Sequence, residues 1–313
     1  MWWSRVLTTL VVLLLIIGAG LGAQLSGTLP VPPPPAPPPE PPPPPPPVGP
    51  PVLAVKVDNA PAARPPTGVD AADVVYVEPV EAGISRLIAV FASRVPPEVG
   101  PVRSARQTDL RLLPQFGNPA LAFSGAAPEL LPAIASAPVL SVSEADESGA
   151  YFRGAGTVPH NLFVRPEQLP DGAGWSPAAP LRFGPPPPGG RPSSGEEISY
   201  PAAAIGFRPV PGGWSVHMDG APFATADGTP LRAGTVVLQE VDVRGSALED
   251  VAGNVSPFAD TVGEGRAVVL RDGKSYEARW SRPVPETGTE YTTPGGAPVA
   301  FAPGQVWVVL VQR

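Results

Sequence analysis

The chain has 313 residues, with 21 Lys and Arg against 28 Asp and Glu, a formal net charge of -7 and a pI near 5.0. This charge offers no basic field to a nucleic-acid backbone, so nucleic acid is not expected as a partner. Cysteine is absent, which excludes disulfides, a thiolate nucleophile, a Cys-ligated zinc site and a lipid-modified cysteine as membrane anchor.

The first residues predict a membrane anchor over 1–29. Val6 to Leu25 are uncharged and mostly aliphatic, and about 20 helical residues cross a hydrocarbon core of about 30 Å. Arg5 precedes this span, and Trp2 and Trp3 lie where interfacial aromatic residues are common. We therefore expect a single-pass protein of the cell membrane with a cytoplasmic N-terminus and an extracytoplasmic bulk. The alternative is a cleaved signal peptide.

Residues 30–51 are almost entirely proline. Proline fixes φ and lacks a backbone donor, so the segment is expected to form neither helix nor sheet. A polyproline II stalk of this length reaches roughly 70 Å, at about 3.1 Å per residue, and would hold the folded part away from the membrane. The alternative is a PxxP ligand for an SH3-like partner.

Residues 52–183 alternate short apolar runs with helix-like stretches, which predicts an α/β domain with a mixed sheet and flanking helices. The expected helices are Ala105 to Leu113 and Pro128 to Ala135; the second opens with Pro and Glu, which a first helical turn tolerates. The expected strands are Val52 to Val57, Val74 to Val77, Leu87 to Phe91 and Leu121 to Phe123, with Val139 to Val142 as a further candidate.

Residues 184–197 are rich in Pro, Gly and Ser, which predicts a linker before a small all-β domain over 198–313. Asp272-Gly273 predicts a tight hairpin turn between two of its strands. The last apolar run predicts a central strand buried on both faces. The expected strands are Trp214 to Met218, Val236 to Val243, Ala267 to Leu270, Tyr276 to Trp280 and Val306 to Val311.

Seven segments beyond the stalk form a recognisable series. They are VKVDNAPAARPPTG at 55–68, ADVVYVEPVEAGISRLIAVF at 72–91, GPVRSAR at 100–106, VPHNLF at 158–163, DGTPLRAGTVVLQEVDV at 227–243, GKSYEARW at 273–280 and PGQVW at 303–307. In order and spacing they resemble the N- and C-terminal domains of the YerB-like family of bacterial lipoproteins. The resemblance implies a domain of unknown function outside the membrane. Those relatives carry a lipidated cysteine, so here the N-terminal helix is expected to replace the lipid.

The segment GPVRSAR is the most suggestive for ligand binding. Ser104 is expected to cap the helix that follows, which would place Arg103 and Arg106 at a helix N-terminus that favours anions. Two guanidinium groups there predict a binding seat for phosphate or carboxylate. The alternative is that both arginines form structural ion pairs with Asp or Glu of the same domain.

Glu78 and Glu81 flank Pro79, with Asp58 and Arg86 near them in sequence. Such acids can act as general acid and base, or bind Mg²⁺ or Ca²⁺ through oxygen. Their spacing matches no defined metal loop, and the sequence has no Walker loop, GxGxxG or HExxH motif, so no metal and no cofactor is expected. Structural ion pairs with the neighbouring arginines are the alternative.

His160 and Asn161 follow a glycine-containing loop, a common place for functional side chains. We expect both to contribute to ligand binding, and His160, with Glu81, is a candidate acid or base. A histidine that only locks its loop by hydrogen bonds is the alternative. His217 lies on the opposite face of an alternating strand and is given no role. Ser124-Gly125 lacks the flanking glycines of a hydrolase elbow.

Together these features favour a membrane-tethered, non-enzymatic extracytoplasmic binding module that recognises an anionic envelope ligand, such as a cell-wall polymer or a lipid phosphate. One alternative is an envelope hydrolase or transferase acting on a phosphorylated or glycan substrate, with His160 or Glu81 as acid or base. Another is an assembly protein that docks an envelope protein without a small ligand. A cleft that joins His160, Glu81 and both arginines would favour the enzyme, and arginines paired by local carboxylates would favour assembly.

Overall fold

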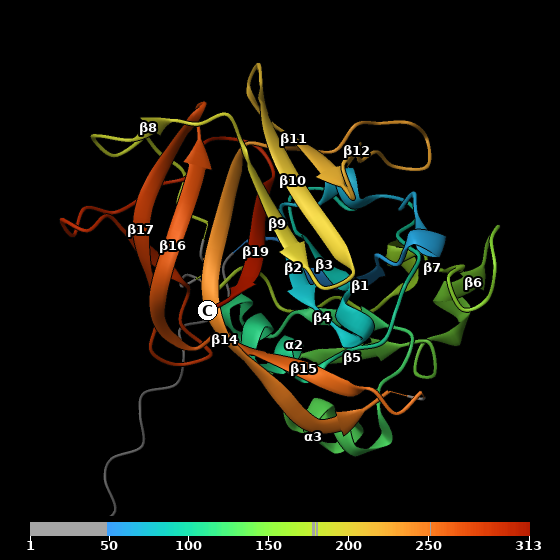
Figure 1. Cartoon of the computed structure of the whole chain (residues 1–313). Helices are drawn as coiled ribbons and strands as arrows, with labels where there is room; N and C mark the ends of the chain where they lie inside the picture. The colour runs from blue at the N-terminus through green and yellow to red at the C-terminus, as the bar shows by residue number, and fades with distance from the viewer. Residues whose placement is uncertain (1–48, 177–178, 180, 251) are drawn as a thin grey trace, which may run out of the picture. The chain divides into compact units, whose positions relative to one another are not determined.

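The computed structural model describes residues 49–176, 179, 181–250 and 252–313 (Figure 1). The expected span from Val6 to Leu25 and nearly all of the expected stalk lie outside these residues. In the part of the chain that is described, no helix is both long and apolar enough to cross a membrane.

One large mixed sheet contains strands from both halves of the chain. Its N-terminal strands are β1 (Leu53–Asp58), β2 (Val74–Pro79), β3 (Ser85–Phe91), β4 (Ala120–Phe123) and β5 (Leu140–Ser143). Its C-terminal strands are β8 (Arg191–Pro192), β14 (Thr235–Glu249), β15 (Val255–Asp260), β16 (Gly263–Arg271), β17 (Lys274–Arg282), β18 (Glu290–Thr292) and β19 (Val306–Gln312). The 12 strands follow the order β18-β17-β16-β14-β19-β2-β3-β1-β4-β5, with β15 paired to β14 and β8 to β17.

The expected combination of an α/β domain and a small all-β domain is wrong, because the protein is mostly β. The described α-helices are α2 (Gln107–Leu112) and α3 (Leu131–Ser136), each six residues long. Helix α3 ends because Ala137 is extended in front of Pro138. Helix α2 instead passes into the 3-10 turn Leu113–Phe116, since Pro114 has no N–H to continue the α-helical hydrogen bonds. The 3-10 turns are Pro61–Ala63, Val69–Ala71, Glu81–Gly83, Leu113–Phe116, Pro128–Leu130, Ser148–Ala150 and Pro166–Gln168.

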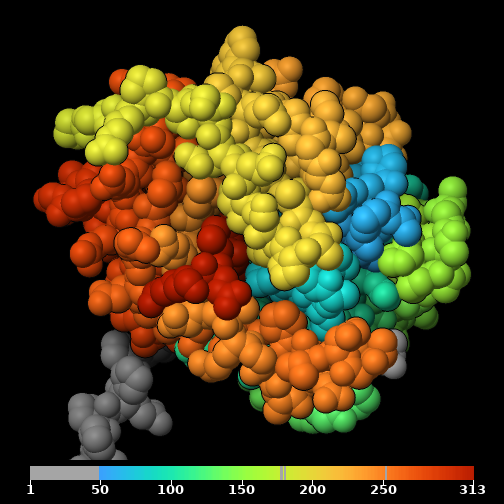
Figure 2. All heavy atoms as spheres, viewed as in Figure 1, coloured from blue at the N-terminus to red at the C-terminus, as the bar shows by residue number. Residues whose placement is uncertain are grey.

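A second, five-stranded antiparallel sheet packs on one face of the large sheet. It consists of β9 (Glu196–Tyr200), β10 (Ala203–Val210), β11 (Gly213–Met218), β12 (Ala221–Pro222) and β13 (Arg232–Ala233), while β6 (Tyr151–Arg153) and β7 (Leu162–Val164) form a separate pair. Phe207 of β10 packs edge-on against Trp307 of β19, and both lie in one apolar core with Val57 and Leu87. In Figure 2 the yellow residues of β9 and β10 lie between the orange and red C-terminal strands and the cyan N-terminal residues.

The other face of the large sheet carries a second core. Ile88 and Val308 of the sheet lie there with Leu112 of α2 and Ile134 of α3. The expected central strand is confirmed, since β19 lies between β14 and β2 and residues 306–310 are all buried. The expected hairpin is confirmed as well: β16 and β17 are joined by Asp272-Gly273, whose φ angles of 51° and 70° suit a tight primed turn.

Candidate functional site

Three neighbouring strands carry a row of charged side chains at one end. In the pairing of β1 with β3, Asp58 lies opposite Arg86, and in the pairing of β2 with β3, Glu78 lies opposite the same Arg86. Residues opposite each other on paired strands point to the same face, so these three side chains lie side by side. It is the face on which α2 and α3 pack.

A cavity of about 630 Å³ opens beside this row. Part of its wall comes from an arm, which we define as Asp242–Glu249 of β14 and Val255–Asp260 of β15; along this length β15 pairs with β14 alone. Figure 1 shows the arm passing α2. The lining residues are Glu81, Ala82, Ile84, Arg86, Arg103 to Arg106, Ala126 to Leu130, Ala247 to Asp250 and Ser256.

Arg86 is the most deeply buried cation of this cavity, at 6% exposure. Its Nη1 donates to the carbonyl of Ser104 at 3.1 Å. Within the described residues, no carboxylate oxygen lies inside the 4.0 Å ion-pair distance of its guanidinium. Burial lowers the pKa of Arg86 to about 10. The positive charge of Arg106 lowers this pKa further, while the nearby carboxylates act in the opposite direction. Arg86 is therefore a buried cation without a contacting counterion.

Arg103 and His160 share one buried carboxylate, that of Asp58. Arg103 Nε lies 3.3 Å from Asp58 Oδ2, and His160 Nδ1 lies 2.8 Å from the same oxygen. The other oxygen, Oδ1, accepts from the backbone N–H of Ala60 at 3.1 Å. The Arg103 side chain is 28% exposed. Its position is fixed by the backbone, since its N–H donates to the carbonyl of Lys56 at 2.8 Å.

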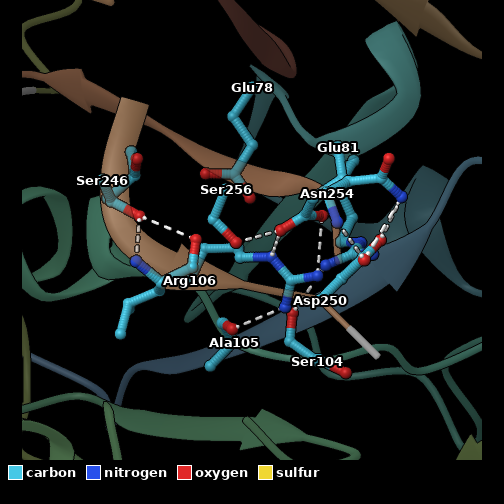
Figure 3. Close-up of polar contacts among 12 residues, drawn as sticks. Glu78, Glu81, Ser104, Ala105, Arg106, Ser246, Asp250, Asn254 and Ser256 are labelled. Atoms are coloured by element: carbon cyan, nitrogen blue, oxygen red, sulfur yellow. Dashed lines mark hydrogen bonds and ion pairs between the residues drawn. The ribbon is translucent and has the colours of Figure 1, made fainter. Parts of the chain in front are cut away.

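Arg106 is held by Glu81 (Figure 3). Its Nε and Nη2 each lie 2.7 Å from a different carboxylate oxygen of Glu81, and Nη1 donates to the Ala105 carbonyl at 2.9 Å. The Ser256 hydroxyl of the arm donates to the same carboxylate. Burial raises the pKa of Glu81, but the bonds from Arg106 and Ser256 outweigh it and hold that pKa below its usual value. For Arg106 the structure therefore favours the structural ion pair.

Ser104 lines the cavity, whereas the Asn161 side chain binds the backbone of a loop. Helix α2 begins at Gln107 and is preceded by Arg106, whose N–H donates to the Asp109 carboxylate at 2.7 Å, so Ser104 does not cap it. The Asn161 side chain donates at 3.2 Å to the carbonyls of Gly154 and Gly156 and so holds the glycine loop.

Lys56, Glu78 and Asp109 form a buried charged triad beside these residues. Its central residue, Lys56, was not among the candidates predicted from the sequence. Lys56 has no exposed surface, and its Nζ donates to Glu78 Oε1 and, at 2.7 Å, to Asp109 Oδ1. Glu78 Oε2 has no hydrogen-bond partner among the described residues. Burial raises the pKa of Glu78 to about 7, since Asp109 offsets part of the opposing effect of Lys56. The available signal was a lysine inside the apolar run LAVKVD.

Candidate residues therefore line two separate cavities. Glu81 and the arginines line the large cavity, while His160 lines a separate hollow with Arg64 and Thr67. A single cleft with His160, Glu81 and both arginines would have favoured the enzyme, and the structure does not bring His160 into that cleft. Within the described ranges, no group of three His, Asp or Glu side chains is placed to hold a metal ion.

Comparison with known proteins identifies the family. Residues 45–176 match the model described as protein of unknown function (DUF3048) N-terminal domain, and residues 199–308 match its C-terminal domain. Over 55 residues, 18% of this chain and 17% of the relative, the sequence is 49% identical to "Putative lipoprotein YerB" of Bacillus subtilis (strain 168). The crystal structure of the YerB protein from Bacillus subtilis has the same fold, with a TM-score of 0.70 at 22% identity, over 84% of this chain and 91% of that one. Because the two family models together match most of its length, the chain belongs to this YerB-like family of proteins of unknown function.

Proposed function

We propose that the protein is a membrane-tethered extracytoplasmic binding module whose large cavity takes an anionic group of a cell-envelope molecule through Arg86 and Arg103. Arg86 carries the proposal, because it is a buried guanidinium at the cavity with no carboxylate in ion-pair contact among the described residues. A buried charge without a partner is unfavourable, and a bound carboxylate or phosphate would supply that partner. A guanidinium can bind such a group with two parallel hydrogen bonds.

Arg103 supports the same ligand. Its contact with Asp58 is made through Nε at 3.3 Å, and its two Nη groups make no hydrogen bond within the described part of the chain. Both Nη groups therefore remain available to a ligand beside Arg86. Arg106 would act indirectly, because its pair with Glu81 and the bond from Ser256 hold the arm that forms one wall.

The extracytoplasmic setting rests on different support. Val6 to Leu25 form an apolar run long enough to span a membrane, and the proline-rich residues 30–51 follow it. The Bacillus subtilis protein that this chain matches over 55 residues is named a lipoprotein. On that side of the membrane, cell-wall polymers and lipid headgroups both present phosphate or carboxylate, and the cavity recognises the chemistry that they share.

A calorimetric titration of the full-length protein with inorganic phosphate and with acetate tests the proposal. Arg103→Ala should weaken binding about 10- to 150-fold, the equivalent of one charge-assisted hydrogen bond of about 1.5 to 3 kcal/mol. The melting temperature should change little, because Arg103 is 28% exposed and the buried Asp58 carboxylate keeps its contacts with His160 and the Ala60 N–H.

Arg266→Ala is the matched control. Arg266 is an 80% exposed arginine of β16, 2.9 Å from Glu240 and outside the cavity, so its loss should leave anion affinity unchanged. Equal losses in the two variants would show nonspecific attraction and would contradict the proposal, as would a wild-type protein that binds neither anion. Titration with a short anionic wall polymer and with vesicles that contain a phosphate headgroup then separates the two sources.

A further inference from the structure

The hollow beside His160 has a different character from the anion cavity. It measures about 470 Å³ and is lined by His160, Arg64, Thr67 and Glu98 together with apolar residues that include Phe163 and Ala226. His160 was expected to belong to the anion site, but it lies outside the lining of that cavity. The hollow therefore requires its own explanation.

Asp58 fixes the orientation of the His160 ring. With Nδ1 2.8 Å from the buried Asp58 carboxylate, the neutral imidazole donates through Nδ1–H and leaves Nε2 as an acceptor. No partner of Nε2 is found in the part of the chain that is described. A hydroxyl group both donates and accepts, so it can satisfy Nε2 whether the ring is neutral or protonated.

The charged side chains Arg64 and Glu98 that line the hollow already have partners in the protein. Arg64 donates through Nε and Nη2 to the Asn59 carbonyl, at 3.0 and 2.8 Å, and pairs with Asp219. Glu98 lies 3.8 Å from Arg165. Without an uncompensated charge, the hollow has no electrostatic preference for an ion, in contrast to the cavity at Arg86. Its apolar lining suits a carbon skeleton, and its free polar groups suit hydroxyls.

We infer that this hollow is a second binding site, which takes a neutral polyhydroxylated ligand, the sugar unit of a glycan, with a ligand hydroxyl bound to His160 Nε2. Thr67 supplies a second hydroxyl partner, and the ring carbons pack against Phe163. Asp58 is a positioning residue for His160. The inference stands on the hollow alone and does not depend on anion binding at Arg86.

The chain contains two histidines, so selective ¹⁵N-histidine labelling reports on the site with a built-in control. Full-length protein in a detergent without sugar or phosphate groups is titrated with a neutral oligosaccharide, chitotriose with all amines acetylated. The Nε2 resonance of His160 should shift. The resonances of His217 should stay in place, because that residue lies in β11 with its Nε2 3.1 Å from the Ser215 hydroxyl. Inorganic phosphate should not displace the saccharide.

Substitutions then test the hydrogen bond. His160→Leu should weaken saccharide binding about 3- to 10-fold, as expected for one neutral hydrogen bond, and His160→Gln, which keeps an acceptor, should retain most of the affinity. His217→Leu should have no effect. The inference is overturned if no saccharide binding is detected, if both histidines shift alike, or if His160→Leu binds as tightly as the wild type. Where a variant fails to fold, the wild-type titration alone decides.

Discussion

Arg103 and Arg106 belong to one heptapeptide, yet the fold gives them different surroundings. Arg106 is 11% exposed and doubly paired with Glu81, whereas Arg103 is 28% exposed and touches its carboxylate at one nitrogen. The sequence identified the motif and left binding and structural pairing open. It could not decide between them, because Glu81 lies 25 residues from Arg106, and Ser256 lies 175 residues from Glu81.

We expect Arg106→Ala to lower the free energy of unfolding by about 3 to 5 kcal/mol, because the change leaves the carboxylate of Glu81 buried without its partner. Chemical denaturation at neutral pH measures this. Arg94→Ala is the control, since Arg94 is 65% exposed and 3.4 Å from Asp70, and a surface pair contributes roughly 0 to 1 kcal/mol. Similar losses for the two variants would mean that the Glu81 pair is not structural.

The buried carboxyl group of Glu78 should make the stability of the protein depend on pH. Burial raises its pKa from 4.5 to about 7, so the folded protein holds this proton more tightly than the unfolded chain does. The contribution is fully present below pH 4.5 and is lost as the pH rises toward 7. Denaturation across this range should show a steeper fall for the wild type than for Glu78→Gln. Equal slopes would contradict the assignment.

At the scale of elements, the sequence predicts the strands of residues 52–142 but not the length of the arm. Every strand expected between residues 52 and 142 forms, because an apolar run between turn residues is a local signal. Strand β14, however, continues for 15 residues to Glu249, well beyond the expected end at Val243. The outer part pairs with β15 alone and includes Gly245 and Ser246, so its composition is that of a loop.

Shortening the arm should weaken anion binding without unfolding the protein. Replacing residues 246–254 by a two-residue Asn-Gly turn removes Leu248, Glu249 and Asp250 from the cavity wall and keeps Ser256. The melting temperature should stay close to that of the wild type, because none of the described residues among them, 246–250 and 252–254, is buried. Phosphate titration of the two proteins gives the comparison. Unchanged affinity would show that the arm is not part of the site.

At the scale of the whole molecule, the two halves of the chain share one sheet. Strand β19 pairs in parallel with β14 on one side and with β2 on the other, where Val306 lies opposite Val74. The linker-like composition of residues 184–197 suggested two separate units. Pairing between strands more than 200 residues apart leaves no local trace in the sequence, which explains why a shared sheet could not be anticipated.

We therefore expect residues 49–183 to fail to fold when they are produced alone, because β2 would lose its neighbour and expose an apolar edge. Co-production with residues 184–313 should restore a soluble complex. Circular dichroism and thermal unfolding compare the fragment, the complex and the intact chain, which should unfold in a single transition. A cooperative transition in the isolated N-terminal fragment would contradict the shared sheet as a condition of folding.

Arg86 and Arg103 are proposed to bind an anion in the cavity between the charged strand ends and the arm. An anomalous difference map from crystals of the protein soaked in tungstate, a heavy analogue of phosphate, would locate this anion. We expect a peak within hydrogen-bond distance of both guanidinium groups, and its loss in Arg103→Ala. Peaks confined to exposed arginines such as Arg266, with none in the cavity, would contradict it.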